Sequence, residues 1–315
     1  MTTAPSSALW AVTCLFNPHK YRRRYANFVQ FRRTLGLPLV AVELSFDGNF
    51  ELQAADAEIL VRVRGGDVMW QKERLLNIGF SHLPPECRFV AVLDSDIAFD
   101  NEDWAADAER LMASHAIIQP FDTARFLAPD ATLEHTTEES RIDSEQRSAA
   151  SRWQLRENVA SSLGSLVGDG HGDTSPGLAW VFRREILDRH GLFDGCVIGG
   201  GDTALACAAL GLFDAVEQRH QMNQRQRDFY RAWAEPFRRD VKGSVAALPG
   251  ALEALWHGDI ARRRSGSRHS TLPTHSFDPR VDIAGEPGEA WRWSSDKPAL
   301  RQDLANYFAS RREDG

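Results

Sequence analysis

The sequence predicts an α/β fold in which helices flank a mostly parallel, Rossmann-like sheet and an irregular C-terminal tail follows. Short apolar runs alternate with helical patterns along the first part of the chain, and this alternation is typical of parallel sheets. The chain has 315 residues, of which 43% are hydrophobic and 26% are charged. That length and balance allow a globular domain with a substantial buried core.

Apolar, β-favouring runs that stop at turn residues predict the strands. They are Leu9–Phe16, Leu39–Leu44, Ile59–Val63, Phe89–Leu93, Ala116–Gln119 and Leu178–Phe182. Apolar residues at helical spacing predict the helices. These are Tyr21–Gly36, Trp70–Phe80, Ser151–Leu166, Arg183–Gly191, Asp202–Leu210, Gln218–Val241, an apolar segment at Leu252–Leu255 and Ala299–Arg312. Residues 122–175 are rich in Ser, Thr, Asp, Glu and Gly, so we expect a mobile insert there.

Charge and composition exclude several classes of protein. The net charge of −7 argues against a general nucleic-acid binder, which needs a basic face. No run approaches the roughly 18 apolar residues of a membrane span, and the N-terminus lacks the pattern of a secretory signal. The four cysteines are scattered, which favours free thiols in a reducing compartment. We therefore expect a cytoplasmic protein, with peripheral contact to anionic lipid through the basic run Tyr21–Tyr25 as a minor alternative.

Two carboxylates follow a strand in the stretch RFVAVLDSDIAFD. The apolar run Phe89–Leu93 ends at Asp94-Ser95-Asp96, and the chain turns apolar again at Ile97–Phe99. Ligands bind beyond the carboxyl ends of the strands in open parallel sheets. Two acids there can jointly face a divalent cation that completes its shell with substrate phosphates. The alternative is an acidic turn or helix cap with no ligand.

Two later segments add candidate ligands and bases. His257 lies in Trp-His-Gly and is either a packed histidine or an imidazole ligand, which suits Mn²⁺ better than Ca²⁺. Gly199-Gly200-Gly201 precedes Asp202, which is either the N-cap of the following helix or a carboxylate that faces an acceptor hydroxyl. In the second case, the glycines let sugar and acceptor approach the backbone closely.

The set of motifs, in its order, resembles the GT-A class of nucleotide-sugar glycosyltransferases, and most closely the family 2-like bacterial enzymes. The resemblance extends from Leu9 to about Arg268 and is weakest at residues 122–175. It is carried by a Lys-x-Arg-x-x-Asn helix (Lys72, Arg74, Asn77), the Asp-x-Asp turn, a Gly-x-Ala-Trp segment (Gly177 to Trp180), the Gly-Gly-Gly-Asp run and the late Trp-His-Gly.

The resemblance implies a role for each matching residue. Asp202 would be the general base, Asp96 and His257 would bind the metal, and Asp94 would lie near the metal and the ribose. Residues bordering the nucleotide would be Ser95, Lys72, Arg74, Asn77, Asp47 and Arg263. Residues bordering the sugar and acceptor would be Trp180, Gly199, Gly200 and Gly201. Ser265 stands where similar proteins often have a tyrosine, and the second strand ends without the paired acids usual in family 2.

The same resemblance implies one glycosyltransferase domain over residues 1–315. Residues 9–121 would form the nucleotide-sugar-binding half, 122–175 the insert, 176–260 the acceptor and catalytic half, and 261–315 the tail. The expected partners are a nucleotide-sugar donor and a hydroxyl acceptor such as a glycan or polysaccharide precursor, with Mn²⁺ or Mg²⁺ as the cofactor. A metal would stabilise the leaving diphosphate, and one carboxylate opposite the leaving group would give inversion.

Three other classes remain as alternatives. A sugar nucleotidyltransferase would need a glycine-rich basic loop after the first strand, where this chain has Phe16-Asn17-Pro18-His19-Lys20. A non-catalytic sugar-binding protein derived from a glycosyltransferase would not need the intact Asp-x-Asp, Gly-Gly-Gly-Asp and Trp-His-Gly segments. A dinucleotide-binding dehydrogenase would need Gly-x-Gly-x-x-Gly after a strand, and the sequence has none.

Overall fold

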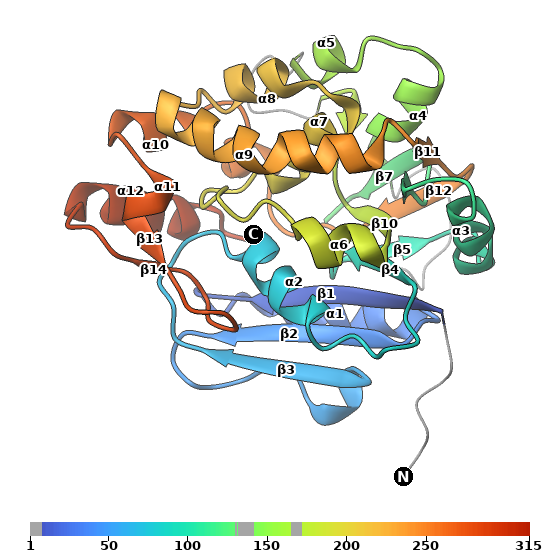
Figure 1. The fold of residues 1–315 in the computed structure, drawn as a ribbon. Helices are drawn as coiled ribbons and strands as arrows, with labels where there is room; N and C mark the ends of the chain where they lie inside the picture. The colour runs from blue at the N-terminus through green and yellow to red at the C-terminus, as the bar shows by residue number, and fades with distance from the viewer. Residues whose placement is uncertain (1–7, 130, 132–141, 165–171) are drawn as a thin grey trace.

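A seven-stranded sheet forms the centre of the fold, which we describe from a computed structural model covering residues 8–129, 131, 142–164 and 172–315 (Figure 1). Its strand order is β11-β6-β10-β4-β1-β2-β3. The strands are β1 (Leu9–Phe16), β2 (Leu39–Ser45), β3 (Ile59–Arg64), β4 (Phe89–Leu93), β6 (Ile117–Gln119), β10 (Ala179–Arg183) and β11 (Val245–Ala247). All neighbouring pairs run parallel except those of β10 with β4 and with β6. The predicted mostly parallel sheet is therefore confirmed.

Alternate residues of the central strands pack against different layers of helices. Leu9 and Ala11 join the cluster that holds Phe28 of α1 (Arg22–Thr34) and Trp104 of α3 (Trp104–Met112). Trp10 and Val12 join the opposite cluster. That second cluster includes buried residues of α2 (Lys72–Phe80), α6 (Arg184–His190), α7 (Gly201–Leu210) and α9 (Gln224–Val241). Burial on both faces explains why the strands read as continuous apolar runs.

A second sheet begins directly after the Asp94-Ser95-Asp96 turn that follows β4. Its order is β5-β12-β7-β8-β9. The strands are β5 (Ile97–Phe99), β12 (Ala251–Ala254), β7 (Thr123–Leu127), β8 (Ile142–Ser148) and β9 (Thr174–Ser175). The chain passes from β4 to β5 through Asp94-Ser95-Asp96, so the two acids lie at the junction between the sheets. This junction explains the apolar residues on both sides of the acids.

Three local predictions are wrong. The apolar segment at Leu252–Leu255 is not a helix, because pairing with β5 and β7 holds it as strand β12. The predicted helix Gln218–Val241 is split into α8 (Phe213–Arg219) and α9, because Asn223 and Gln226 form a capping box that begins α9. In the described part of the predicted helix Ser151–Leu166, which ends at Gly164, the chain instead forms the short helices α4 (Ala149–Gln154) and α5 (Val159–Gly164).

The segment 122–175 has more regular structure than its composition predicts. In its described part, β7 and β8 pair antiparallel, β9 pairs with β8, and the helices α4 and α5 follow β8. The main chain of β7 and β8 is satisfied by this pairing, so polar side chains can face solvent. The rest of the predicted insert lies outside the described residues.

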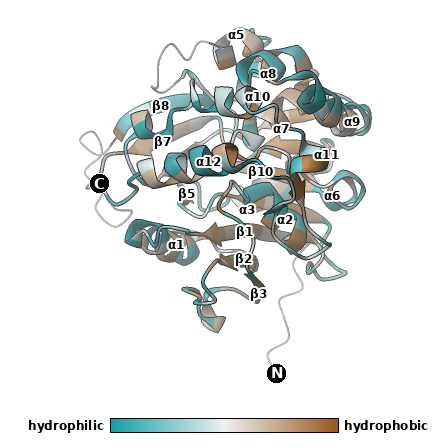
Figure 2. Ribbon diagram, turned by 90° about the vertical axis from the view of Figure 1, so that its left-hand side faces the viewer, coloured by the Kyte–Doolittle hydropathy of each residue, from teal (hydrophilic) through white to brown (hydrophobic). Residues whose placement is uncertain are grey.

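The C-terminal tail wraps around the body, as predicted. It contains the short elements η2 (Ile260–Arg263), η3 (Arg268–Ser270), α10 (Thr271–Thr274), α11 (Pro279–Asp282), β13 (Ile283–Ala284) and β14 (Arg292–Trp293), and the longer α12 (Pro298–Ser310). Buried residues of α12, among them Leu300 and Tyr307, pack with Phe16 and Val42 in a third cluster. In Figure 2, β1 is brown inside the molecule, whereas the outer helix α8 is teal.

Two remaining expectations concern cysteines and membrane spans. All four cysteines are free thiols, and three of them, Cys87, Cys196 and Cys207, are buried. Burial raises the pKa of Cys87 to about 11, which favours the unreactive thiol. Among the described residues, no helix combines the length and the hydropathy that crossing a membrane requires.

Candidate active site

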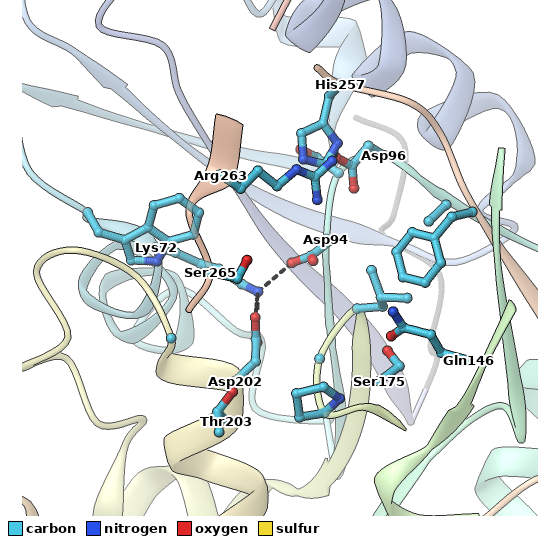
Figure 3. A pocket seen from close by; sticks show the side chains of 18 of the residues that line it. Lys72, Asp94, Asp96, Gln146, Ser175, Asp202, Thr203, His257, Arg263 and Ser265 are labelled. Atoms are coloured by element: carbon cyan, nitrogen blue, oxygen red, sulfur yellow. Dashed lines mark hydrogen bonds and ion pairs between the residues drawn. The ribbon is translucent and has the colours of Figure 1, made fainter. Parts of the chain in front are cut away.

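A pocket of about 280 Å³ opens at the junction between the two sheets (Figure 3). It is lined by the end of β1, the Asp94–Asp96 turn, the start of α7, the loop after β12 and the C-terminal tail. This is the crevice beyond the carboxyl ends of parallel strands β1 and β4, where ligands bind in open α/β sheets. These and further lining residues, among them side chains of α1, α2 and α8, come from widely separated parts of the chain to one cavity.

Asp96 and His257 meet at the edge of this pocket. The His257 Nδ1 lies 2.7 Å from an Asp96 carboxylate oxygen, although the two residues come from the turn after β4 and the loop after β12. Burial alone would raise the pKa of Asp96, but His257, Arg263 and Arg24 hold it below its ordinary value. Burial, and then Arg263, lower the pKa of His257. At neutral pH the pair is therefore a carboxylate beside a neutral imidazole.

A carboxylate and a neutral imidazole fit a divalent cation such as Mn²⁺. Neighbouring ligands of an octahedral ion with bonds of about 2.1 Å lie about 3 Å apart, so this pair needs only a small opening to share one. Within the described residues, no group of three or more His, Cys, Asp or Glu side chains is placed to hold a metal ion. Asp96 and His257 would therefore need substrate oxygens or water to complete a coordination shell.

Lys72 joins Asp94 to Asp202 at the centre of the pocket. Its Nζ lies 2.5 Å from Asp94 and donates to both Asp202 carboxylate oxygens, at 2.9 and 3.1 Å (Figure 3). Burial opposes the charge of Lys72, but Asp202, Asp94 and Glu73 together raise its pKa well above the ordinary value. Lys72 is thus held as a cation between the two carboxylates. Because Asp94 is engaged in this way, it is not free to bind a metal in this arrangement.

Glu73 lies behind the same cluster. It is only 5% exposed, and its Oε1 has no hydrogen-bond partner among the described residues. Burial raises the pKa of Glu73 to about 8, with Lys72 opposing the rise and Asp202 adding to it. Burial likewise raises the pKa of Asp94. One ammonium therefore faces more carboxyl groups than it can neutralise, and a proton on the unpartnered Glu73 relieves the excess.

Asp202 does not cap its own helix. Gly200, with φ of 94°, is the N-cap residue of α7, and Asp202 lies in the first turn. Its carboxylate faces Lys72 and the pocket, so the helix-cap interpretation of Asp202 is wrong. A negative charge in the first turn is still favourable for the helix dipole. Gly200 is required at its position, since a side chain there would need the left-handed conformation and would meet the ring of His220 at 2.7 Å.

Arginines of the C-terminal tail and of α1 form the wall next to Asp96 and His257. Arg263 is half-buried with an unpartnered buried Nε, and burial lowers its pKa to about 10. Glu313 accepts from Arg24 Nη2 at 2.8 Å and from Arg311 Nε at 2.5 Å. Burial opposes the charge of Glu313, but these two arginines hold its pKa below the ordinary range. Glu313 therefore fixes the guanidinium groups of Arg24 and Arg311 in the pocket wall.

Several residues that the sequence analysis assigned to the nucleotide or sugar lie away from this pocket. Arg74 stacks on Trp291 and donates to carbonyl groups of the tail. Asn77 exchanges two hydrogen bonds with the backbone of Leu192. Asp47 accepts hydrogen bonds from Ser45, Asn49 and Lys20 at the surface.

Of the predicted sugar-side residues, Gly200 lines the pocket. Trp180 is buried and donates its indole N–H to Pro176, and Gly199 and Gly201 are not among the lining residues. The predicted residues that do line the pocket are Lys72, Asp94, Ser95, Asp96, Gly200, Asp202, His257 and Arg263.

Other lining residues were missed by sequence reasoning. Arg24 belongs to a basic run that reads as a solvated face, yet its side chain enters the pocket wall. Arg219, His269 and Arg311 occupy no recognisable motif. Tyr307 of α12 is not a lining residue, but it lies directly behind the pocket wall. Its hydroxyl accepts from Arg268 at 2.9 Å and donates to the Arg263 carbonyl at 3.2 Å, so it supplies the aromatic hydroxyl that Ser265 lacks.

No family model matches the chain, and no curated protein matches it. Among solved structures, it is similar to S. aureus TarS (10% identity, TM-score 0.41), covering 96% of this chain but only 43% of that one. It is similar to the mannosyltransferase PcManGT from Pyrobaculum calidifontis, solved with GDP-Man and Mn²⁺ (12% identity, TM-score 0.40, 96% of this chain and 73% of that chain).

It is also similar to the 4-diphosphocytidyl-2C-methyl-D-erythritol synthase from Anaerococcus prevotii. That match has 9% identity and a TM-score of 0.33, and it covers 78% of this chain and 88% of that one. At identities of 12% or less and TM-scores of 0.41 or less, these likenesses do not show an activity for this chain.

Proposed function

We propose that this protein is a metal-dependent, inverting glycosyltransferase that moves a sugar from a nucleotide-sugar donor to a hydroxyl acceptor. One observation carries the proposal: the Asp96–His257 pair and the Asp94–Lys72–Asp202 cluster line the same pocket. A carboxylate–imidazole pair suits a cation that holds a diphosphate, and a separate carboxylate in the same cavity suits proton transfer. Transfer of a sugar from a nucleoside diphosphate needs stabilisation of the leaving diphosphate and removal of the acceptor proton, and the two groups suit these two tasks.

The residues would divide the chemistry as follows. Asp96 and His257 would hold Mn²⁺ or Mg²⁺, which when bound supplies positive charge against the leaving diphosphate. Arg263, half-buried beside Asp96 and without an ion-pair partner among the described residues, would add a second positive charge there. Preorganised charges of this kind act strongly because the pocket partly excludes water.

Asp202 would accept the proton of the acceptor hydroxyl. Its carboxylate keeps lone pairs free beyond the two bonds from Lys72, because an ionised carboxylate can accept about four hydrogen bonds. Lys72 would orient Asp202 and keep Asp94 from turning toward the metal pair. A single base acting on the acceptor, with direct displacement of the diphosphate, gives inversion at the anomeric carbon. A glycan or polysaccharide precursor remains the proposed acceptor class.

A sugar nucleotidyltransferase is the second candidate. The loop after β1 gives it little support, because Asn17 is bonded to Tyr21 and Glu51 and Lys20 is bonded to Asp47. Neither side chain lines the pocket. The two activities differ in products: a nucleotidyltransferase releases pyrophosphate, whereas the proposed enzyme releases a nucleoside diphosphate.

The test begins with calorimetric titration of UDP, GDP and dTDP with and without Mn²⁺. We expect one nucleotide to bind at least tenfold more tightly with Mn²⁺, and Asp96→Ala and His257→Ala to remove that gain while melting like the wild type. The matched control is Asp103→Ala, which removes an exposed carboxylate outside the pocket. Equal binding by Asp96→Ala and wild type would disprove the metal assignment. Nucleotide-sugars of the base that binds are then assayed for release of nucleoside diphosphate or pyrophosphate.

A further inference from the structure

A second group of basic side chains meets at the Gly199–Gly200 turn, before α7. Arg219 and His220 end helix α8, and Arg268 and His269 belong to η3. The rings of His220 and His269 are stacked, with centroids 3.9 Å apart and an interplanar angle of 13°. Gly200 lies against both rings, since a Cβ on it would come 2.7 Å from His220 and 2.8 Å from His269. Two distant segments thus place four basic groups around one helix N-terminus; we call them the Arg219–His269 cluster.

No carboxylate neutralises this cluster within the described part of the chain. Neither Arg219 nor Arg268 forms an ion pair there: Arg219 donates to the Leu163 carbonyl, and Arg268 donates to the Arg263 carbonyl and the Tyr307 hydroxyl. Burial, followed by the charge of Arg268, lowers the pKa of Arg219. The pKa of His220 falls to about 3, first through burial and then through the two arginines. The two arginines therefore supply the charge, and the histidines stay neutral.

Two buried nitrogen atoms of the cluster have no hydrogen-bond partner among the described residues. His220 is only 4% exposed, and its Nε2, at the ring edge that faces Gly200, has no partner among the described residues. The buried Nε of Arg268 is also without a described partner. Burying unpaired guanidinium groups and an unsatisfied imidazole nitrogen is costly unless a ligand compensates. A basic last turn is favourable for the dipole of α8, but this does not explain why the cations lie close together and partly buried.

The place of the cluster decides which group of the substrate it would meet. Arg219, Arg268, His269 and Gly200 all line the pocket that contains Asp202. Gly200 is two residues before Asp202, so the cluster lies against the same helix start as the proposed base. In the proposed function, Asp96 and His257, through a metal ion, and Arg263 already bind the diphosphate of the donor. Among the described residues, the other basic group beside Asp202 is Lys72, and two carboxylates already bind it. The cluster therefore remains available for an oxyanion on the acceptor.

We propose that the Arg219–His269 cluster and the N-terminus of α7 form an anion subsite that binds a phosphate-like group of the acceptor. This inference rests on the proposed function, because it names the acceptor class of the same pocket. Guanidinium groups bind phosphoryl oxygens by paired hydrogen bonds, and a helix N-terminus offers backbone N–H groups and a positive dipole. The acceptor would thus be a hydroxyl compound that carries a phosphoryl group near the hydroxyl.

The test is a calorimetric titration with inorganic phosphate, first with the protein alone and then with the protein saturated with the nucleoside diphosphate and Mn²⁺ that it binds. We expect phosphate to bind in both cases. Arg219→Gln should weaken that binding at least tenfold while changing nucleotide affinity less than threefold. Arg225→Gln is the matched control, since Arg225 is an exposed cation outside the pocket that pairs with Asp278. Arg219→Lys should retain part of the affinity because it keeps the charge.

Three results would overturn the inference. If saturating nucleotide abolishes phosphate binding, or if Arg219→Gln weakens nucleotide and phosphate equally, the cluster serves the donor diphosphate. If Arg219→Gln and Arg225→Gln bind phosphate alike, the cluster binds no anion. Failure of the proposed function has a different signature, namely that no nucleoside diphosphate binds to the wild type. The titration of the protein alone, compared between the two variants, would then still decide on the anion subsite.

Discussion

Gly177 lies so close to Asp202 that a side chain on it would displace the carboxylate. A Cβ at Gly177 would come 2.7 Å from Asp202 Cγ and 2.9 Å from its Cβ. The backbone of Gly177 does not have a positive φ, so the reason for glycine here is space and not conformation. The chain entering β10 is therefore fitted against the first turn of α7, and this contact helps to set the direction in which Asp202 points.

Gly177→Ala should accordingly reduce turnover without removing nucleotide binding. The added methyl group would push Asp202 away from Lys72, and displacing a catalytic group by about 1 Å can cost about 100-fold in rate. We expect at least a tenfold loss of transfer activity, with nucleotide–Mn²⁺ affinity within threefold of the wild type and a small decrease in Tm. Unchanged turnover together with an unchanged Tm would show that the contact does not position Asp202.

Asp202→Asn tests the base directly. Asparagine keeps the size of the side chain and can still accept from Lys72, but it cannot take a proton at neutral pH. Transfer should therefore slow by roughly a hundred- to ten-thousand-fold. The variant should bind nucleotide–Mn²⁺ normally, since Asp202 does not belong to the Asp96–His257 pair. Measurement of single-turnover transfer with the true acceptor provides the check, and retention of most activity would exclude Asp202 as the base.

The sequence predicted most of the fold because the signals for it are local. Apolar runs such as Phe89–Leu93 are buried on both faces, so their pattern is continuous and easily read. Strand β12 was predicted as a helix because a segment as short as Leu252–Leu255 carries no distinguishable period, and its partners β5 and β7 are distant in sequence.

For the site, recognisable motifs supplied Asp96, Asp202 and His257, but not the contacts between them. Lys72 was expected to border the nucleotide, and no local pattern indicates that it joins Asp94 to Asp202. Arg219 and Arg311 are ordinary helix-end or tail arginines in sequence, and only the fold carries them into the pocket. Residues such as Arg74 and Asn77 have the expected spacing on α2, but the tail and the Leu192 backbone occupy their side chains.

Glu313→Gln tests whether the end of the chain organises the pocket. Glu313 is 1% exposed and pairs with both Arg24 and Arg311. Removing one partner of a buried ion pair leaves charge uncompensated and typically costs about 3–5 kcal/mol. Of the two partner arginines, Arg311 is buried like Glu313, whereas Arg24 is partly exposed. We therefore expect a loss at the lower end of that range, measured as a reduced urea midpoint, together with weaker nucleotide–Mn²⁺ binding.

Asp314→Asn is the control for this variant. Asp314 accepts from the backbone N–H groups of Arg22 and Arg23 at the start of α1, but it pairs with neither pocket arginine. It should therefore change stability by about 1 kcal/mol or less and leave nucleotide affinity unaltered. If Glu313→Gln behaves like Asp314→Asn, the buried carboxylate is not needed to hold Arg24 and Arg311 in the pocket wall.

Glu73→Gln should change how stability depends on pH. The pKa of Glu73 is raised from 4.5 to about 8 in the folded protein, first by burial. The folded state therefore keeps this proton while the unfolded state loses it, and the free energy of unfolding falls as pH rises from 4.5 to about 8. Glutamine cannot ionise, so the variant lacks this loss. Relative to the wild type, it should gain roughly 1 kcal/mol or more at pH 8 and little near pH 4.5.

The measurement is urea unfolding of both proteins at several values between these two pH limits. The difference in free energy of unfolding should grow steadily in favour of Glu73→Gln, because the unpartnered Oε1 no longer has to stay protonated beside Asp94 and Asp202. Glu217→Gln gives the contrast: Glu217 is equally buried but paired with Arg231, so its loss should destabilise throughout this range. A difference between wild type and Glu73→Gln that stays constant with pH would mean that Glu73 ionises normally, and that Lys72 neutralises it together with the two aspartates.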